Sequence, residues 1–130
     1  MTTAPTRFVI QIAGPPPRKN TRHDHAPGRP VNSADFKSLV SALRIAWGRR
    51  PTITAGLWSV KIEATWSRKR RLSCGAVIPY ADVDAPISNV HDALEHAGIF
   101  DNDNRIDEIV ARRQHDPERP GVLVIIERVA

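Results

Sequence analysis

Residues 82–103, DVDAPISNVHDALEHAGIFDND, join two acidic groups through the pattern of an amphipathic helix. Residues 79–83 are expected to be extended. Side chains two apart in an extended chain point the same way, so Asp82 and Asp84 can share one ion. A second acidic turn, residues 101–104, follows the helix. This arrangement can bring carboxylates from distant sequence positions to one point. Clustered carboxylate oxygens are what a hard cation such as Mg²⁺ requires.

The helix in this segment is predicted from apolar residues at helical spacing. The predicted buried stripe consists of Ile87, Val90, Leu94 and Ala97. Asp84 is the expected N-cap, Pro86 suits the first turn, and Gly98 is the expected residue after the C-cap. Ser88 and Asp92 are four residues apart on a different face. Asp92 therefore either joins the acidic cluster or points into solvent.

Acidic residues are concentrated in this part of an otherwise basic chain. Residues 81–108 contain eight Asp or Glu and one basic residue, Arg105, a net charge of −7 within a chain of +5, so the remainder carries +12. A pI of about 10.1 favours polyanionic partners, nucleic acid first, although many small basic proteins only carry solvated Lys and Arg faces. An acidic island in a basic protein indicates a metal site that faces a phosphate backbone.

Length and composition predict a single domain, residues 1–130, with one hydrophobic core. The hydrophobic fraction of 41% and the charged fraction of 25% are typical of a globular protein. Cys74 has no partner for an internal disulfide or a Cys-based zinc site, and a buried or partly buried thiol is expected there. Residues 1–5 lack the apolar core of a signal peptide, and no run approaches a membrane span. A soluble, cytoplasmic protein is therefore expected.

The remaining elements complete a small fold. Strands are predicted at residues 7–13, 57–66, 106–114 and 122–126, and a helix from Asn32 or Ser33 to Trp47. Residues 122–126 are apolar on both faces, as in a central strand. The order β, α, β, α, β, β predicts a small α/β (α+β) domain, in which a mixed sheet of about four strands packs with two main helices.

Two basic segments are candidates for contacts with DNA phosphates. Residues 18–31 are rich in Pro and Gly and are expected to form a mobile basic loop that carries Arg18, Lys19 and Arg22. The His-Asp-His triplet at residues 23–25 could be a metal motif, but such a triplet in a loop is more often merely exposed. The second segment is the run Arg68, Lys69, Arg70 and Arg71. It fits a solvated loop and a phosphate-binding segment equally well.

The order and spacing of these motifs resemble the RusA family of Holliday junction resolvases. The matching residues are Asp82-Val83-Asp84, Asp92-Ala93-Leu94, Ala97-Gly98, Asn102-Asp103 before a strand, Pro120-Gly121-Val122, and the first strand with its continuation through residues 15–20. The resemblance spans most of the chain and is densest over residues 80–127.

The resemblance implies a RusA-like fold and a bacterial or phage-type enzyme of DNA recombination and repair. The implied activity is metal-dependent endodeoxyribonuclease cleavage of branched DNA, a four-way (Holliday) junction, by a homodimer whose two sites cut opposed strands. Asp82, Asp84 and Asp103 are implied as catalytic acids that bind Mg²⁺, with Mn²⁺ as the alternative ion. Asp92 and Ser88 are secondary candidates for the same site.

Three positions depart from the family pattern. Ala85 replaces the family's Asn, and Asn102 replaces the first acid of the later pair. Ser88 stands where the family has a catalytic lysine. A lysine there could stabilise charge on the scissile phosphate, and losing such a group typically costs ~10²–10³ in rate. The protein is therefore slow, uses another cation, or binds branched DNA without cutting it. The other cations considered are Lys19, Arg105 and residues 68–71. A regulatory protein whose acidic patch docks a basic partner is the remaining alternative.

Overall fold

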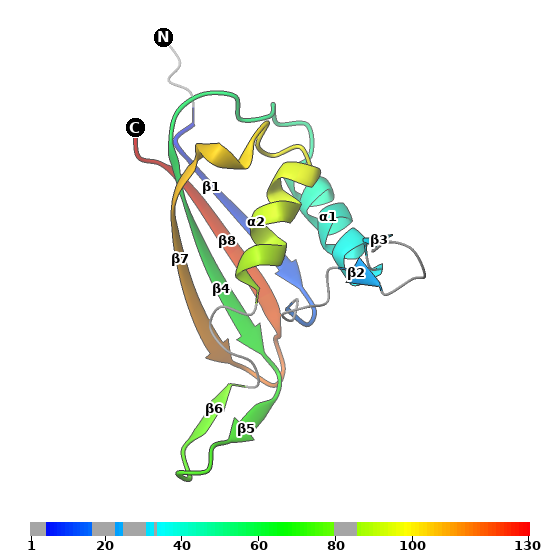
Figure 1. Ribbon diagram of the computed structural model, residues 1–130, viewed down its shortest axis with the longest axis vertical. Coiled ribbons are helices and arrows are strands. Elements are labelled where there is room, and N and C mark those ends of the chain that lie inside the picture. The colour runs from blue at the N-terminus through cyan, green and yellow to red at the C-terminus, as the bar shows by residue number, and fades with distance from the viewer. Residues whose placement is uncertain (1–4, 17–22, 25–30, 33, 80–85) are drawn as a thin grey trace.

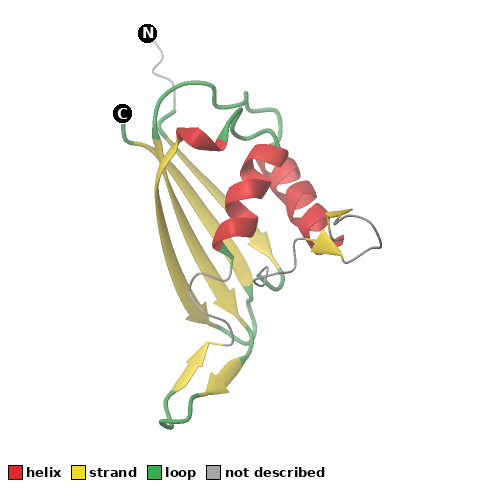
Figure 2. Cartoon of the chain, in the orientation of Figure 1, coloured by secondary structure: helices red, strands yellow, loops and turns green. Residues whose placement is uncertain are grey.

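The computed structural model describes residues 5–16, 23–24, 31–32, 34–79 and 86–130 (Figures 1 and 2). A four-stranded mixed sheet is covered on one face by two helices, which confirms the predicted small α+β fold. The sheet consists of β1 (Arg7–Ala13), β4 (Trp58–Trp66), β7 (Ile106–His115) and β8 (Gly121–Arg128). The helices are α1 (Ala34–Trp47) and α2 (Ile87–His96).

The strand order β1-β8-β4-β7 places β8 inside the sheet, antiparallel to both of its neighbours. This confirms the prediction that residues 122–126, which are apolar on both faces, belong to a central strand. β4 and β7 are parallel. Parallel neighbours need a crossover of a dozen or more residues, and residues 67–105 provide it. The crossover includes α2, which packs on the helical side of the sheet.

The hydrophobic core lies between the sheet and the two helices. Along β4 every second side chain from Trp58 to Trp66 is buried, while the side chains between them are partly exposed. The strand predicted at residues 57–66 is confirmed, and it has one buried face and one partly exposed face. The apolar side chains at helical spacing on α1 are also buried: Phe36, Leu39, Val40, Leu43 and Trp47.

The start of α2 differs from the prediction. The helix begins at Ile87, and Pro86 occupies the N-cap position without a side-chain hydrogen bond, so the predicted Asp84 N-cap is wrong. The backbone of Pro86 is already helical (φ −87°, ψ −9°), and its carbonyl accepts the Val90 N–H at 2.9 Å. Because the proline ring restricts φ to helical values, the helix can start there without a polar cap.

The end of α2 agrees with the prediction, because Gly98 follows the C-cap with a φ of +77°. Its N–H donates to the Glu95 carbonyl at 3.0 Å, and the Ile99 N–H donates to the Leu94 carbonyl at 3.1 Å. These bonds satisfy carbonyls that the helix leaves free.

Gly98→Ala should lower the free energy of unfolding by about 1–2 kcal/mol, the cost of a left-handed conformation for a residue with a Cβ. The added methyl group would meet no atom within 4 Å, so backbone strain alone is tested. Urea unfolding measures the loss. Gly98→Asn is the matched control and should lose less, because Asn tolerates this conformation. Equal losses for the two variants would contradict this explanation.

Two segments expected as loops contain paired strands instead. The basic run forms β5 (Lys69–Arg71), which pairs with β6 (Val77–Pro79) in an antiparallel hairpin. Within the predicted 18–31 loop, β2 (His23–Asp24) pairs with β3 (Val31–Asn32). Arg18, Lys19 and Arg22 lie outside the described residues. The predictions missed both pairings because charged and Pro-rich composition hides a short strand.

Cys74 is exposed, so the expectation of a buried or partly buried thiol is wrong. It lies in the turn of the β5–β6 hairpin, which the Leu72 N–H closes by donating to the Ala76 carbonyl at 2.8 Å. The thiol is exposed because the described side chains of this hairpin lie outside the hydrophobic core cluster.

Candidate metal centre

Three metal-ligating side chains converge beside α2. His91 and Asp92 lie on α2, and Asp103 begins the 3₁₀ turn η1 (Asp103–Arg105). One nitrogen or oxygen atom of each side chain lies within 4.8 Å of the others, and all three residues are partly exposed. We call these residues the His91–Asp92–Asp103 cluster. It brings together side chains from two separate elements of the acidic segment.

Buried residues hold η1 beside the helix. Ile99 and Phe100 follow Gly98 directly and are almost fully buried, at 0% and 1% exposure. The Ile53 N–H donates to the Ile99 carbonyl at 2.8 Å, and the Asp101 N–H donates to the Ile53 carbonyl at 3.1 Å. The chain is therefore anchored immediately before the acidic turn.

The acidic turn is organised by its own side chains. The Asn102 side-chain oxygen accepts the Asn104 N–H at 2.8 Å, and Asn102 is the N-cap of η1. Such local bonds between side chain and backbone favour turns over regular structure. They set the backbone that presents Asp103.

Arg105 pairs with Asp101 through two hydrogen bonds. Its Nε donates to Oδ1 at 2.5 Å and its Nη2 donates to Oδ2 at 3.0 Å. These side-chain bonds hold the pKa of the Asp101 carboxyl below its ordinary value of 3.8, and the attraction of the Arg105 charge adds to this. The same pairing raises the pKa of Arg105. Arg105, one of the cations considered as a replacement for the family lysine, is therefore engaged by Asp101.

The structure brings some of the predicted site residues together. Asp92 and Asp103, two of the candidate site residues, lie in the His91–Asp92–Asp103 cluster. Ser88 is exposed on α2, one turn before Asp92. Asp82 and Asp84 lie outside the described residues. His91 lies at the edge of the apolar stripe of α2 and was not predicted as a site residue.

The donor set of this cluster fits a divalent cation. Mg²⁺ is commonly bound by one or two protein carboxylates together with substrate phosphates, and Asp92 and Asp103 supply two carboxylates. The imidazole of His91 suits transition metals such as zinc, copper, iron or nickel, while carboxylates suit Mg²⁺ and Mn²⁺. Carboxylates beside a histidine can thus hold a hard ion or a first-row transition metal.

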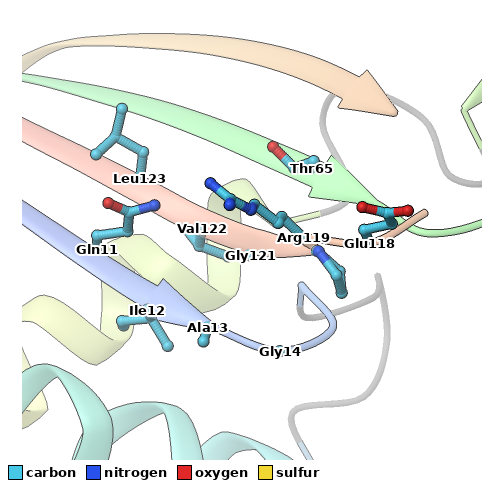
Figure 3. A pocket seen from close by; sticks show the side chains of 11 residues that line it. Gln11, Ile12, Ala13, Gly14, Thr65, Glu118, Arg119, Gly121, Val122 and Leu123 are labelled. Carbon is cyan, nitrogen blue, oxygen red and sulfur yellow. The ribbon is translucent and has the colours of Figure 1, made fainter. Parts of the chain in front are cut away.

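A separate depression of about 530 Å³ lies at the end of β1, where the chain enters β8 (Figure 3). Its lining includes Gln11, Thr65 and Leu123 from the sheet and Glu118 and Arg119 from the turn before β8. None of the residues that line it belongs to the His91–Asp92–Asp103 cluster. The depression is therefore not part of the candidate metal centre.

Comparisons with known proteins add no family assignment. The chain matches no protein-family model and no curated protein. The resemblance to RusA resolvases therefore rests on the motif spacing in the sequence. Neither of the two described helices is long and apolar enough to cross a membrane.

Proposed function

We propose that this protein is a metal-dependent endodeoxyribonuclease that resolves four-way DNA junctions by paired phosphodiester hydrolysis, in DNA recombination and repair. The observation that carries the proposal is the convergence of Asp92 and Asp103. Both belong to the motif that resembles the RusA pattern. The net charge of +5 on the chain also favours a polyanionic substrate.

The proposed chemistry is assigned to carboxylates of the acidic segment. Asp103 and Asp92 would bind Mg²⁺ or Mn²⁺, and the resemblance adds Asp82 and Asp84. A bound ion of this kind polarises a phosphoryl oxygen and lowers the pKa of a coordinated water. The basic residues of segments 18–31 and 68–71 would hold the DNA arms through their phosphates, which predicts steep salt dependence of binding. In a homodimer, two such centres would act on opposed strands.

The test is incubation of the purified protein with a labelled synthetic four-way junction in Mg²⁺ or Mn²⁺. Linear duplex of the same sequence is the substrate control. Paired nicks on opposed strands of the junction are expected. Equal binding of junction and duplex, without nicks, would overturn the proposal and favour the acidic patch as a docking site for a basic protein.

A second candidate is a branched-DNA-binding protein that is weakly active or inactive. It is favoured by the exposed Ser88 on α2, at the position of the family's lysine. Ser88→Lys would place a cation four residues before Asp92 on the same helical face. If a missing cation limits the rate, this variant should cleave about 10²–10³ times faster than the wild type. Selective junction binding with no nicks from either protein would assign the chain to this second class.

A further inference from the structure

The β5–β6 hairpin projects beyond the end of the main sheet (Figure 1). Its strands form a separate two-stranded sheet, and β6 also contacts β7. None of the hairpin side chains that the structure describes belongs to the hydrophobic core cluster. The exposed fraction of Val77 is 51%, that of Leu72 is 36%, and Cys74 is also exposed. The core therefore does not depend on side chains of this hairpin.

The hairpin carries a high density of positive charge. Residues 67–79 contain four Lys or Arg and no Asp or Glu. The pairing of Lys69 with Pro79 and of Arg71 with Val77 places Lys69 and Arg71 on the same face of the hairpin. Arg68 precedes them and is exposed. Within the described part of the chain, none of these three cations forms an ion pair.

Cations so close together repel one another, and a polyanion relieves that repulsion. The shape of the hairpin selects among polyanions. A two-stranded β-ribbon fits the major groove of B-form DNA, where Lys and Arg reach the flanking phosphates. Residues 67–79 contain no Trp or Tyr, the residues that anchor proteins at membrane interfaces. These features favour duplex DNA over an anionic membrane.

The hairpin lies far from η1 along the edge strand β7. β7 starts directly after η1, and its last residue, His115, contacts the Ser67 carbonyl through Nε2 at 3.3 Å. Its ten residues span roughly 30 Å, the length of about nine base pairs. The charge changes sign along β7, from Asp107 and Glu108 near its start to Arg112 and Arg113 near its end. The basic end of β7 adjoins the base of the hairpin.

We infer that the β5–β6 hairpin is a DNA-binding arm that inserts into a groove of a duplex and contacts its phosphates through Arg68, Lys69 and Arg71. The inference rests on the proposed function because that function identifies the polyanion as DNA. It does not require that the protein cleaves DNA. The arm binds DNA at a distance from the candidate metal centre. It therefore contributes to affinity and to the salt dependence of binding, and takes no part in the chemical step.

The first test replaces Arg68, Lys69 and Arg71 together with Gln and measures binding to a four-way junction and to linear duplex in EDTA. The slope of log affinity against log salt should become shallower by about 2.7, the loss of three phosphate contacts. The matched control, Arg7→Gln with Lys37→Gln and Arg49→Gln, removes the same charge at exposed positions elsewhere and should leave the slope unchanged. An unchanged slope in the hairpin variant, or an equal change in both, would overturn the inference.

The second test uses the native cysteine. Cys74 is the only cysteine of the chain and is exposed in the hairpin turn. A DNA-cleaving iron chelate attached to it should cut one duplex arm of the junction, about nine base pairs or more from the branch. The inference would be overturned if the bound DNA were not cut, or if the cuts were confined to the branch. It would also be overturned if the hairpin variant lost affinity for anionic vesicles and kept its affinity for DNA. Both tests measure DNA binding without the catalytic metal. Their results can therefore be interpreted even if the protein has no nuclease activity.

Discussion

Asp103→Asn is expected to abolish metal-dependent cleavage of a four-way junction, with a loss in rate of at least about 10²–10³. The variant keeps the size of the side chain and removes its charge. Asp103 meets Asp92 and His91 within 4.8 Å, so the substitution removes one of the two carboxylates in the cluster. Cleavage under single-turnover conditions measures the chemical step, and Mn²⁺ titration measures binding of the ion directly.

Asp107→Asn is the matched control for this prediction. Asp107 is exposed on β7, lies four residues from Asp103, and is not part of the cluster. The control makes the same change in net charge, so a general electrostatic effect on DNA binding would appear in both variants. We expect weaker Mn²⁺ binding and loss of cleavage in Asp103→Asn alone. Equal Mn²⁺ affinity of both variants and the wild type would remove Asp103 from the metal centre.

The main helices and strands could be predicted because the spacing of apolar residues along the sequence indicates which side chains are buried. β4 alternates over its full length, and the apolar run of β8 reflects an inner strand with neighbours on both sides. The parallel pairing of β4 with β7 could not be predicted, because its partners are about fifty residues apart and local patterns carry no such information. The hairpin was missed because the four cations before Leu72 hide a strand pattern.

The candidate site could be predicted in part, for a similar reason. The spacing of acidic residues predicted Asp103 as a site residue and did not decide whether Asp92 joins the site or points into solvent. Both residues are in the cluster. His91 was missed because helical periodicity assigns each residue to one face, whereas a residue at the edge of a stripe can also reach a neighbouring element. The buried Ile99 and Phe100 bring η1 to that edge, a tertiary effect that acts across the fold.

Ile62→Ala should lower the free energy of unfolding by about 2–5 kcal/mol, a large part of the 5–15 kcal/mol typical of a domain. Ile62 is 0% exposed on β4 and lies between Val124 and Ala111 of the neighbouring strands. Removal of its branched chain leaves a cavity that the packed sheet can only partly close. Urea unfolding should show a lower midpoint with an unchanged slope.

Ile45→Ala makes the same chemical change at an exposed site, because Ile45 is 81% exposed on α1, and it should change stability by less than about 0.5 kcal/mol. Comparable losses in the two variants would show that burial on β4 does not set the stability. Ile62 also separates stability from function. Below its unfolding midpoint, Ile62→Ala should bind Mn²⁺ like the wild type, whereas Asp103→Asn should bind Mn²⁺ weakly and keep its urea midpoint. The core and the candidate metal centre would then be independent: the sheet supports α2 and η1, and the acidic side chains supply the chemistry.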